Sequence, residues 1–167
     1  MRRLLFEGLF HRPVTDPAPL ADERLRLAAD LDVAAKRRLG RSLAIRALDA
    51  GSCNGCELEI NALQNAVYDL ERFGLHIVAS PRHADVLLVT GPMTLNMREA
   101  ALRTYFATPD PKWVVAVGDC AATGGMFAGS YACLGPTSAL LPVSLAIPGC
   151  PPSPTALLRG LLTLMQA

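Results

Sequence analysis

The sequence of 167 residues lacks the features of a secreted or membrane-spanning chain. It has no uninterrupted apolar run of about 18 residues, so no transmembrane helix is expected. Glu7 and His11 break the apolar start, MRRLLFEGLFHRP, and no A-x-A-like cleavage site follows it. Both absences argue against a signal peptide. We therefore expect a cytoplasmic protein, whose five cysteines stay reduced and do not form disulfides.

Charge is also scarce, and it is unevenly spread. Residues 51–167 hold only fourteen Lys, Arg, Asp and Glu residues, whereas residues 1–50 hold seventeen. The second part therefore lies well below the quarter of charged residues that is typical of globular domains. It is either a compact fold rich in Gly and Pro or a fold that buries much of its surface against partner subunits. The net charge of +1 gives no indication of a nucleic-acid partner.

Residues 1–41 are expected to form an N-terminal extension with one helix over residues 21–38. Acidic residues lie early in this helix and basic residues late, which matches the helix dipole, and Gly40 is expected to end it. An apolar cluster within residues 4–10 precedes the helix and lies beside Arg2 and Arg3. This cluster either packs on its own domain or anchors the chain on a membrane or partner subunit. The extension is thus the expected partner- or membrane-contacting region.

Strands and helices alternate through residues 42–167. The patterns predict helices over residues 57–74, 95–107 and 153–165, and strands over residues 42–48, 75–80, 85–91, 112–118 and 142–147. Several strands are near-continuous apolar runs, which indicates an α/β fold with a mainly parallel sheet covered by helices on both faces. The PRHA connection, residues 81–84, is short for a parallel crossover. One of the strands that it joins is therefore expected to be short or at an edge.

Four cysteines follow three of these strands. Cys53 and Cys56 form a CxxC pair after the first strand, and Cys120 and Cys150 follow the strands at 112–118 and 142–147. Because the carboxyl ends of parallel strands meet at one edge of a sheet, the four thiols can converge. Four thiolates suit zinc or an iron–sulfur cluster. One CxxC pair joined by two distant cysteines is a looser arrangement than the usual structural zinc site, and it suits a larger group.

Other interpretations of the cysteines and glycines are weaker. Cys133, in the loop SYACLGP, is expected to be a buried free thiol. A thioredoxin-like pair at Cys53 and Cys56 would leave Cys120 and Cys150 unexplained. The two glycines at 124–125 lie outside any G-x-G-x-x-G or P-loop pattern, so a bound flavin has little local support.

Four sequence blocks carry a family resemblance. GSCNGCELEI, SPRHADVLLVTGP, GDCAATGG and IPGCPPSPTALLRG resemble the small subunit of membrane-bound, energy-converting nickel–iron hydrogenases, including the formate hydrogenlyase type. They also resemble the homologous cluster-bearing subunit of respiratory complex I. The blocks occur in order over residues 42–165. The spacing C-N-G-C is the hydrogenase form, whereas the complex I subunit has two adjacent cysteines at this place.

The resemblance implies a flavodoxin-like, doubly wound fold for residues 42–167 and one [4Fe–4S] cluster. Its ligands would be Cys53, Cys56, Cys120 and Cys150. It implies an electron-transfer subunit, not catalytic alone, that passes electrons to or from a nickel–iron centre in a separate hydrogenase large subunit. The other implied partners are a ferredoxin-like iron–sulfur subunit and membrane-arm subunits, with the chain peripheral on the cytoplasmic face. A complex I-like quinone oxidoreductase subunit and a zinc-stabilised scaffold without redox role are the alternatives.

Glu57 and Glu59 follow the CxxC pair at the start of a predicted helix. Two positions apart, they do not share a helix face. They are either helix-start carboxylates favoured by the dipole, or one of them serves proton transfer at the boundary with the large subunit. The resemblance to complex I slightly favours Glu59. Arg82 is expected either to hold a partner carboxylate or to lower the cost of cluster charge.

Overall fold

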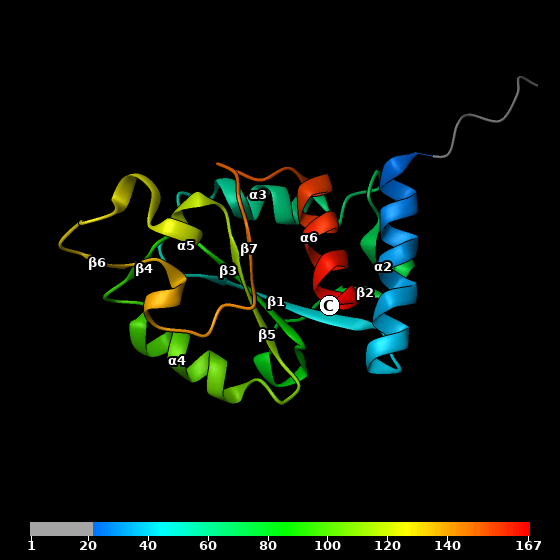
Figure 1. The fold of residues 1–167 in the computed structure, drawn as a ribbon, viewed down its shortest axis with the longest axis horizontal. Coiled ribbons are helices and arrows are strands. Elements are labelled where there is room, and N and C mark those ends of the chain that lie inside the picture. The colour runs from blue at the N-terminus through cyan, green and yellow to red at the C-terminus, as the bar shows by residue number, and fades with distance from the viewer. Residues whose placement is uncertain (1–21) are drawn as a thin grey trace, which may run out of the picture.

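The computed structural model describes residues 22–167, so the predicted apolar cluster at residues 4–10 lies outside the described residues. All neighbouring strands of the central sheet are parallel, and their order is β2-β1-β3-β5-β7 (Figure 1). They comprise β1 (Leu43–Asp49), β2 (Leu75–Ile77), β3 (Val86–Thr90), β5 (Trp113–Val117) and β7 (Leu145–Ile147). This order is the flavodoxin-like one, so the predicted fold class is confirmed. No helix of residues 22–167 is long and apolar enough to cross a membrane.

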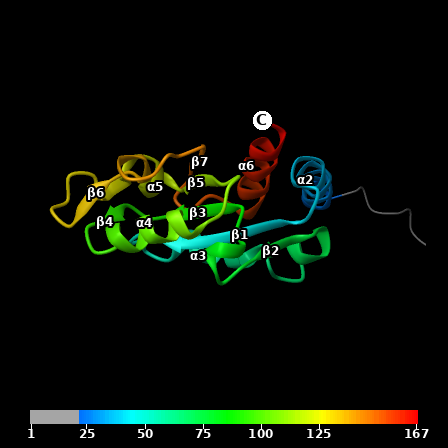
Figure 2. The ribbon, with the colours of Figure 1, turned by 90° about the horizontal axis from the view of Figure 1, so that it is seen from below.

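Helices cover both faces of the sheet, as the apolar strands require. β3 is buried along its whole length. Alternate residues of β3 and β5 enter two different cores: Leu88 and Val115 lie in one, Leu87 and Val114 in the other. The first core is completed by α2 (Glu23–Leu39), α3 (Gly55–Ala62) and α6 (Pro154–Gln166), the second by α4 (Arg98–Ala107) (Figures 1 and 2).

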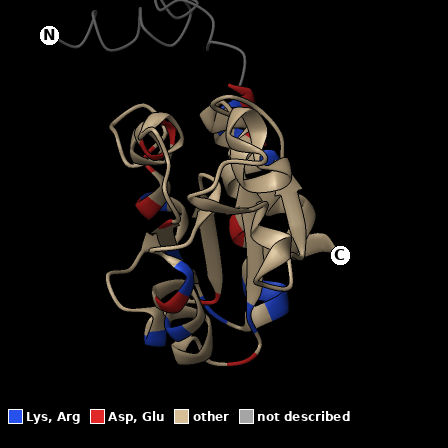
Figure 3. Cartoon of the chain, turned by 90° about the vertical axis from the view of Figure 1, so that its left-hand side faces the viewer, with Lys and Arg blue, Asp and Glu red and all other residues tan. Residues whose placement is uncertain are grey.

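Short elements that were not predicted lie outside the central sheet. A short helix, α5 (Asp119–Thr123), follows β5 directly, and β4 (Met93–Thr94) pairs antiparallel with β6 (Cys133–Gly135). β6 and all of α5 except Asp119 belong to the segment 120–158, which contains no Lys, Arg, Asp, Glu or His and therefore has no blue or red in Figure 3. We call it the uncharged segment. Its short elements lack the apolar periodicity from which longer helices and strands are predicted.

Helix α2 packs against the rest of the domain. Its Leu31 and Ala35 lie in the same core as Leu157 of α6. The helix begins after Asp22, whose carboxylate accepts a hydrogen bond from the Arg24 amide at 3.0 Å, and it ends at Gly40 with φ +70°. The predicted stop at Gly40 is therefore confirmed. That the extension contacts a partner or membrane stays a prediction.

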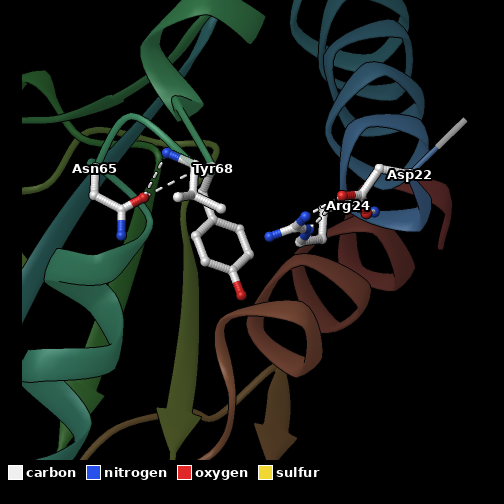
Figure 4. Close-up of polar contacts among 5 residues, drawn as sticks. Asp22, Arg24, Asn65 and Tyr68 are labelled. Carbon is white, nitrogen blue, oxygen red and sulfur yellow. Dashed lines mark hydrogen bonds and ion pairs between the residues drawn. The ribbon is translucent and has the colours of Figure 1, made fainter. Parts of the chain in front are cut away.

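The helix predicted over residues 57–74 is wrong in its second half. α3 ends at Ala62, and Leu70–Phe73 form a separate 3-10 turn. Between them, the Asn65 side-chain oxygen accepts hydrogen bonds from the amides of Val67 and Tyr68 at 2.9 and 3.1 Å (Figure 4). Side chains that bond nearby amides in this way compete with the helix, and they end it here. Arg24 of α2 lies 5.6 Å from the Tyr68 ring centroid and covers the resulting loop.

The short PRHA connection is explained by the place of β2. This strand has three residues and lies at the sheet edge, and β1 separates it from β3. The expectation of a short or edge strand is confirmed. The 3-10 turn Pro81–His83 leads into Asp85, which ties the amino ends of three strands together. Its amide donates to the Ala44 carbonyl at 2.8 Å and its carbonyl accepts from the Trp113 amide at 3.0 Å.

The first prediction concerns the Asp85 carboxylate, which is 2% exposed. It accepts hydrogen bonds from the Ala44 amide at 2.9 Å and from two nitrogens of Arg41 at 2.9 and 2.5 Å. Asp85→Ala removes these charge-assisted bonds and leaves the Ala44 amide without that acceptor, so the free energy of unfolding should fall by about 2 kcal/mol. Urea denaturation measures it.

The matched control is Glu99→Ala, which removes the exposed ion pair with Arg103. This change should cost about 0.5 kcal/mol or less. Equal destabilisation by the two substitutions would contradict a structural role for Asp85.

Candidate metal centre

Four cysteine side chains line one cavity at the carboxyl ends of the strands. Cys53 comes from the turn between β1 and α3, Cys56 from the first turn of α3, Cys120 from the first turn of α5, and Cys150 from the loop after β7. The cavity has a volume of about 120 Å³ and is also lined by Ser52, Gly55, Gly91, Asp119, Gly149 and Pro151. The four predicted residues are thus brought together, and their role as ligands stays a prediction.

Glycines allow the loops to approach the sulfur atoms closely. Gly118 has φ +85°, and a Cβ atom added there would lie 2.7 Å from Cys56 Sγ. A Cβ atom at Gly125 would lie 2.9 Å from Cys120 Sγ. Both distances are shorter than real Cβ contacts, so any side chain would displace a sulfur atom or the backbone. The glycines of GDCAATGG therefore shape the cavity.

The thiols lie in an environment that disfavours bare thiolates. Burial first, and then the charges of Glu57 and of the other three cysteines, raise the pKa of Cys56 to about 11. Burial also raises the pKa of Cys120, and the nearby Cys150 and Cys53 add to this effect. A hydrogen bond from the Met126 backbone acts in the opposite direction. A cationic metal group bonded to the sulfur atoms would supply the missing compensation.

The four thiols form a donor set for a metal group. They surround one cavity, and a [4Fe–4S] cluster takes one thiolate at each of its irons. A tetrahedral zinc site likewise uses four ligands, placed around one point. Within residues 22–167, no three His, Cys, Asp or Glu side chains are placed to hold one metal ion. The donor set fits a group bound by four thiolates, and the cluster itself stays a prediction.

Glu57 belongs to a hydrogen-bonded network that fixes the CxxC turn. Its carboxylate accepts hydrogen bonds from the Ser52 hydroxyl at 2.6 Å and from the Thr90 hydroxyl at the end of β3. Ser52 Oγ in turn accepts from the Asn54 amide at 3.0 Å, and Asp49 Oδ1 accepts from the Ser52 amide at 2.7 Å. The network ties the turn to the ends of β1 and β3. This geometry gives Glu57 a structural role at the helix start.

Glu59 has different surroundings. It is half-buried, and it makes no side-chain hydrogen bond or ion pair with another residue in the described part of the chain. Leu58, between the two glutamates, is largely exposed. Glu59 does not line the cysteine cavity. A role for either glutamate in proton transfer stays a prediction.

Arg82 and Cys133 lie away from the cavity. Arg82 is exposed in the turn that leads into the amino end of β3, whereas the cysteines lie at the carboxyl ends of the strands. Whether Arg82 holds a partner carboxylate or acts on cluster charge stays a prediction. Cys133 is a free thiol in β6, opposite Thr94 of β4, and it is half-buried where full burial was expected. It does not line the cavity.

Sequence reasoning did not single out Asp119 or the apolar surface beside the cavity. Asp119 lines the cavity next to Cys120. Within the uncharged segment, Met126 is 85% exposed and Tyr131 is 96% exposed, and Phe127 is partly exposed. The absence of charge over residues 120–158 was the signal in the sequence for this surface.

Comparisons with known proteins agree with this geometry. The family model described as NADH ubiquinone oxidoreductase, 20 Kd subunit, matches residues 53–164. Formate hydrogenlyase subunit 7 of Escherichia coli (strain K12) is 43% identical over 145 residues, which are 86% of this chain and 56% of that protein. The chain thus spans little more than half the length of that relative.

Two further comparisons cover similar parts of the chain. The probable membrane-bound hydrogenase subunit mbhJ of Pyrococcus furiosus is 45% identical over 128 residues, which are 77% of each protein. Among solved structures, a chain of the membrane-bound sulfane sulfur reductase (MBS), an archaeal respiratory membrane complex, superposes with a TM-score of 0.67 at 36% identity. That match covers 87% of this chain and 75% of the other.

The second prediction tests the close approach at Gly118. Gly118→Ala places a methyl group against Cys56 Sγ, so iron bound per chain after anaerobic reconstitution should fall to less than about half that of the unchanged protein. Iron analysis and the visible absorbance spectrum measure this.

Gly129→Ala is the control, because Gly129 also has a positive φ, +81°, but an added Cβ atom meets nothing within 4 Å. Both positions have a positive φ that side chains rarely adopt, so both variants introduce backbone strain and only Gly118→Ala adds the contact with Cys56. Equal iron binding by both would show that contact with Cys56 does not matter.

Proposed function

Because the chain belongs to the family of the NADH ubiquinone oxidoreductase 20 kDa subunit, we propose that it is an electron-transfer subunit holding one [4Fe–4S] cluster. Subunits of this family are parts of oxidoreductase complexes and typically bind such a cluster. Four thiols around one cavity, at the carboxyl ends of parallel strands, are the observation that supports this function.

In this function, Cys53, Cys56, Cys120 and Cys150 hold the cluster, which supplies one-electron transfer when bound. The chain's own residues set its environment. The partial burial of Cys56 limits contact with water, and the Met126 backbone amide donates toward Cys120. Hydrogen bonds to ligand sulfur atoms and solvent exposure both tune the reduction potential of such a cluster. The chain contributes the path for electrons and does not turn over substrate alone.

The proposed partner is a hydrogenase-type large subunit that carries the nickel–iron centre. The C-N-G-C spacing and the hydrogenase names of two relatives support this choice. The uncharged segment, which contains Cys120, Cys150 and the exposed Met126 and Tyr131, is the surface that we assign to this partner. A ferredoxin-like subunit and membrane-arm subunits would complete the complex, with the chain peripheral on the cytoplasmic face.

A complex I-like quinone oxidoreductase is the second candidate, because the matching family model is described by a complex I subunit. Hydrogen evolution by the purified complex, measured beside quinone reduction, distinguishes the two. Activity with quinone and none with protons would replace the hydrogenase assignment and keep the electron-transfer role. A zinc-stabilised scaffold is the third candidate, and metal analysis separates it because a zinc protein is colourless.

The third prediction concerns the cluster itself. Anaerobically purified protein should be brown and carry about four irons per chain. Changing any one of Cys53, Cys56, Cys120 or Cys150 to Ala should lower the iron content, because each removes one thiolate ligand. Iron and sulfide analysis with electron paramagnetic resonance measures this.

Cys133→Ala is the matched control, since Cys133 lies outside the cavity, and it should retain the full iron content. Stoichiometric zinc without visible absorbance would contradict the electron-transfer function. Loss of the cluster in Cys133→Ala alone would show that the ligand set is wrong.

The fourth prediction separates the two glutamates. In the assembled complex, Glu59→Gln should keep the cluster and lower hydrogen evolution at least about tenfold, equivalent to about 1.4 kcal/mol of barrier. Glu57→Gln should instead lower cluster content, because its carboxylate joins the Ser52 and Thr90 hydroxyls.

Glu71→Gln, at an exposed position in the 3-10 turn, is the control and should change neither quantity. Full hydrogen evolution by Glu59→Gln would remove the proton-transfer role from Glu59.

A further inference from the structure

Asp119 joins the two cysteine loops at the β5 and β7 end of the cavity. Its carboxylate oxygen Oδ1 accepts a hydrogen bond from the Gly149 amide at 2.8 Å. Its own amide donates to the Gly149 carbonyl at 2.9 Å. Asp119 directly precedes Cys120, and Gly149 directly precedes Cys150. One pair of residues thus couples the backbones of two thiol-bearing loops.

The pair continues the sheet beyond its last regular residues. The Gly118 amide donates to the Ile147 carbonyl at 2.8 Å, and the Asp119–Gly149 contacts follow one step later. Gly149 has φ +135°, and a Cβ atom added there would lie 2.7 Å from Pro152 Cα. The chain therefore turns sharply at Gly149. In this turn the Asp119 carboxylate is the side-chain acceptor of the Gly149 amide.

The carboxylate also brings a negative charge to the cavity wall. Asp119 is among the residues that line the cavity, and it directly precedes Cys120 in the chain. A negative charge in the cavity wall opposes the addition of an electron to a group bound in the cavity. Net charge around an iron–sulfur cluster is one of the quantities that set its reduction potential.

Building on the proposed function, we propose that Asp119 is a positioning residue of the cluster site with two separable effects. Its hydrogen bond to Gly149 holds the Cys150 loop against the start of α5, next to Cys120. Its charge lowers the reduction potential of the bound cluster. Asp119 touches no substrate, and it acts through the two cysteine loops and through its electric field.

Two substitutions separate these effects. Asp119→Asn keeps an oxygen that accepts from the Gly149 amide but removes the charge, whereas Asp119→Ala removes both. Asp110→Asn is the charge-matched control, because the Asp110 side chain is 84% exposed and lies outside the cavity. All variants are made in the full chain.

Amide hydrogen exchange at Gly149 tests the hydrogen bond, with or without a bound cluster. Asp119→Ala should speed exchange at Gly149 by about tenfold, and Asp119→Asn should leave it within about threefold of the unchanged chain. Unchanged exchange in Asp119→Ala would overturn the positioning effect.

A redox titration followed by electron paramagnetic resonance, at one pH, tests the charge. The midpoint potential should become more positive in Asp119→Asn and stay unchanged in Asp110→Asn. An unshifted potential in Asp119→Asn would overturn the charge effect. If the unchanged chain takes up no iron, the proposed function fails, whereas the exchange measurement at Gly149 still decides the positioning effect.

Discussion

Close packing of backbone around four sulfur atoms is the constraint on which the rest of the structure depends. The thiols come from the ends of β1, β5 and β7, and they meet because these strands are parallel and end at one edge. Glycine at positions 118 and 125 is required where the backbone passes the sulfur atoms. The networks around Glu57 and Asp119 then fix the loops. One cavity therefore depends on the sheet order, the glycines and the polar contacts together.

Much of the fold and of the cysteine site can be predicted from patterns in the sequence. Apolar runs mark β3 and β5, and the cysteines that follow β1, β5 and β7 indicate one site because parallel strands share a direction. The end of α2 at Gly40 and the start of α6 at Ser153 follow from residues with strong preferences for those positions. These features depend on local residue preferences or on the parallel order of the sheet, and each of these can be recognised in the sequence.

The features that sequence reasoning missed depend on contacts between distant residues or on single side chains. The break after Ala62 follows from hydrogen bonds of Asn65 to nearby amides, which no periodicity indicates. The bond of Asp119 to Gly149 joins residues thirty positions apart. The place of the Pro81–His83 turn, at the amino end of β3 and away from the cysteine cavity, likewise follows from the arrangement of the strands.

The position of β7 links metal uptake to folding. This strand has three residues, and within residues 22–167 it lies at the sheet edge and pairs with β5 alone, yet it carries the loop of Cys150. A group held by all four thiols can bind the chain only when β7 is paired with β5. Its binding free energy therefore adds to the stability of that edge by mass action. Conversely, a chain with β7 detached keeps three of the four thiols and loses affinity for the group. A three-residue edge strand and a group bound by the four thiols would thus stabilise each other.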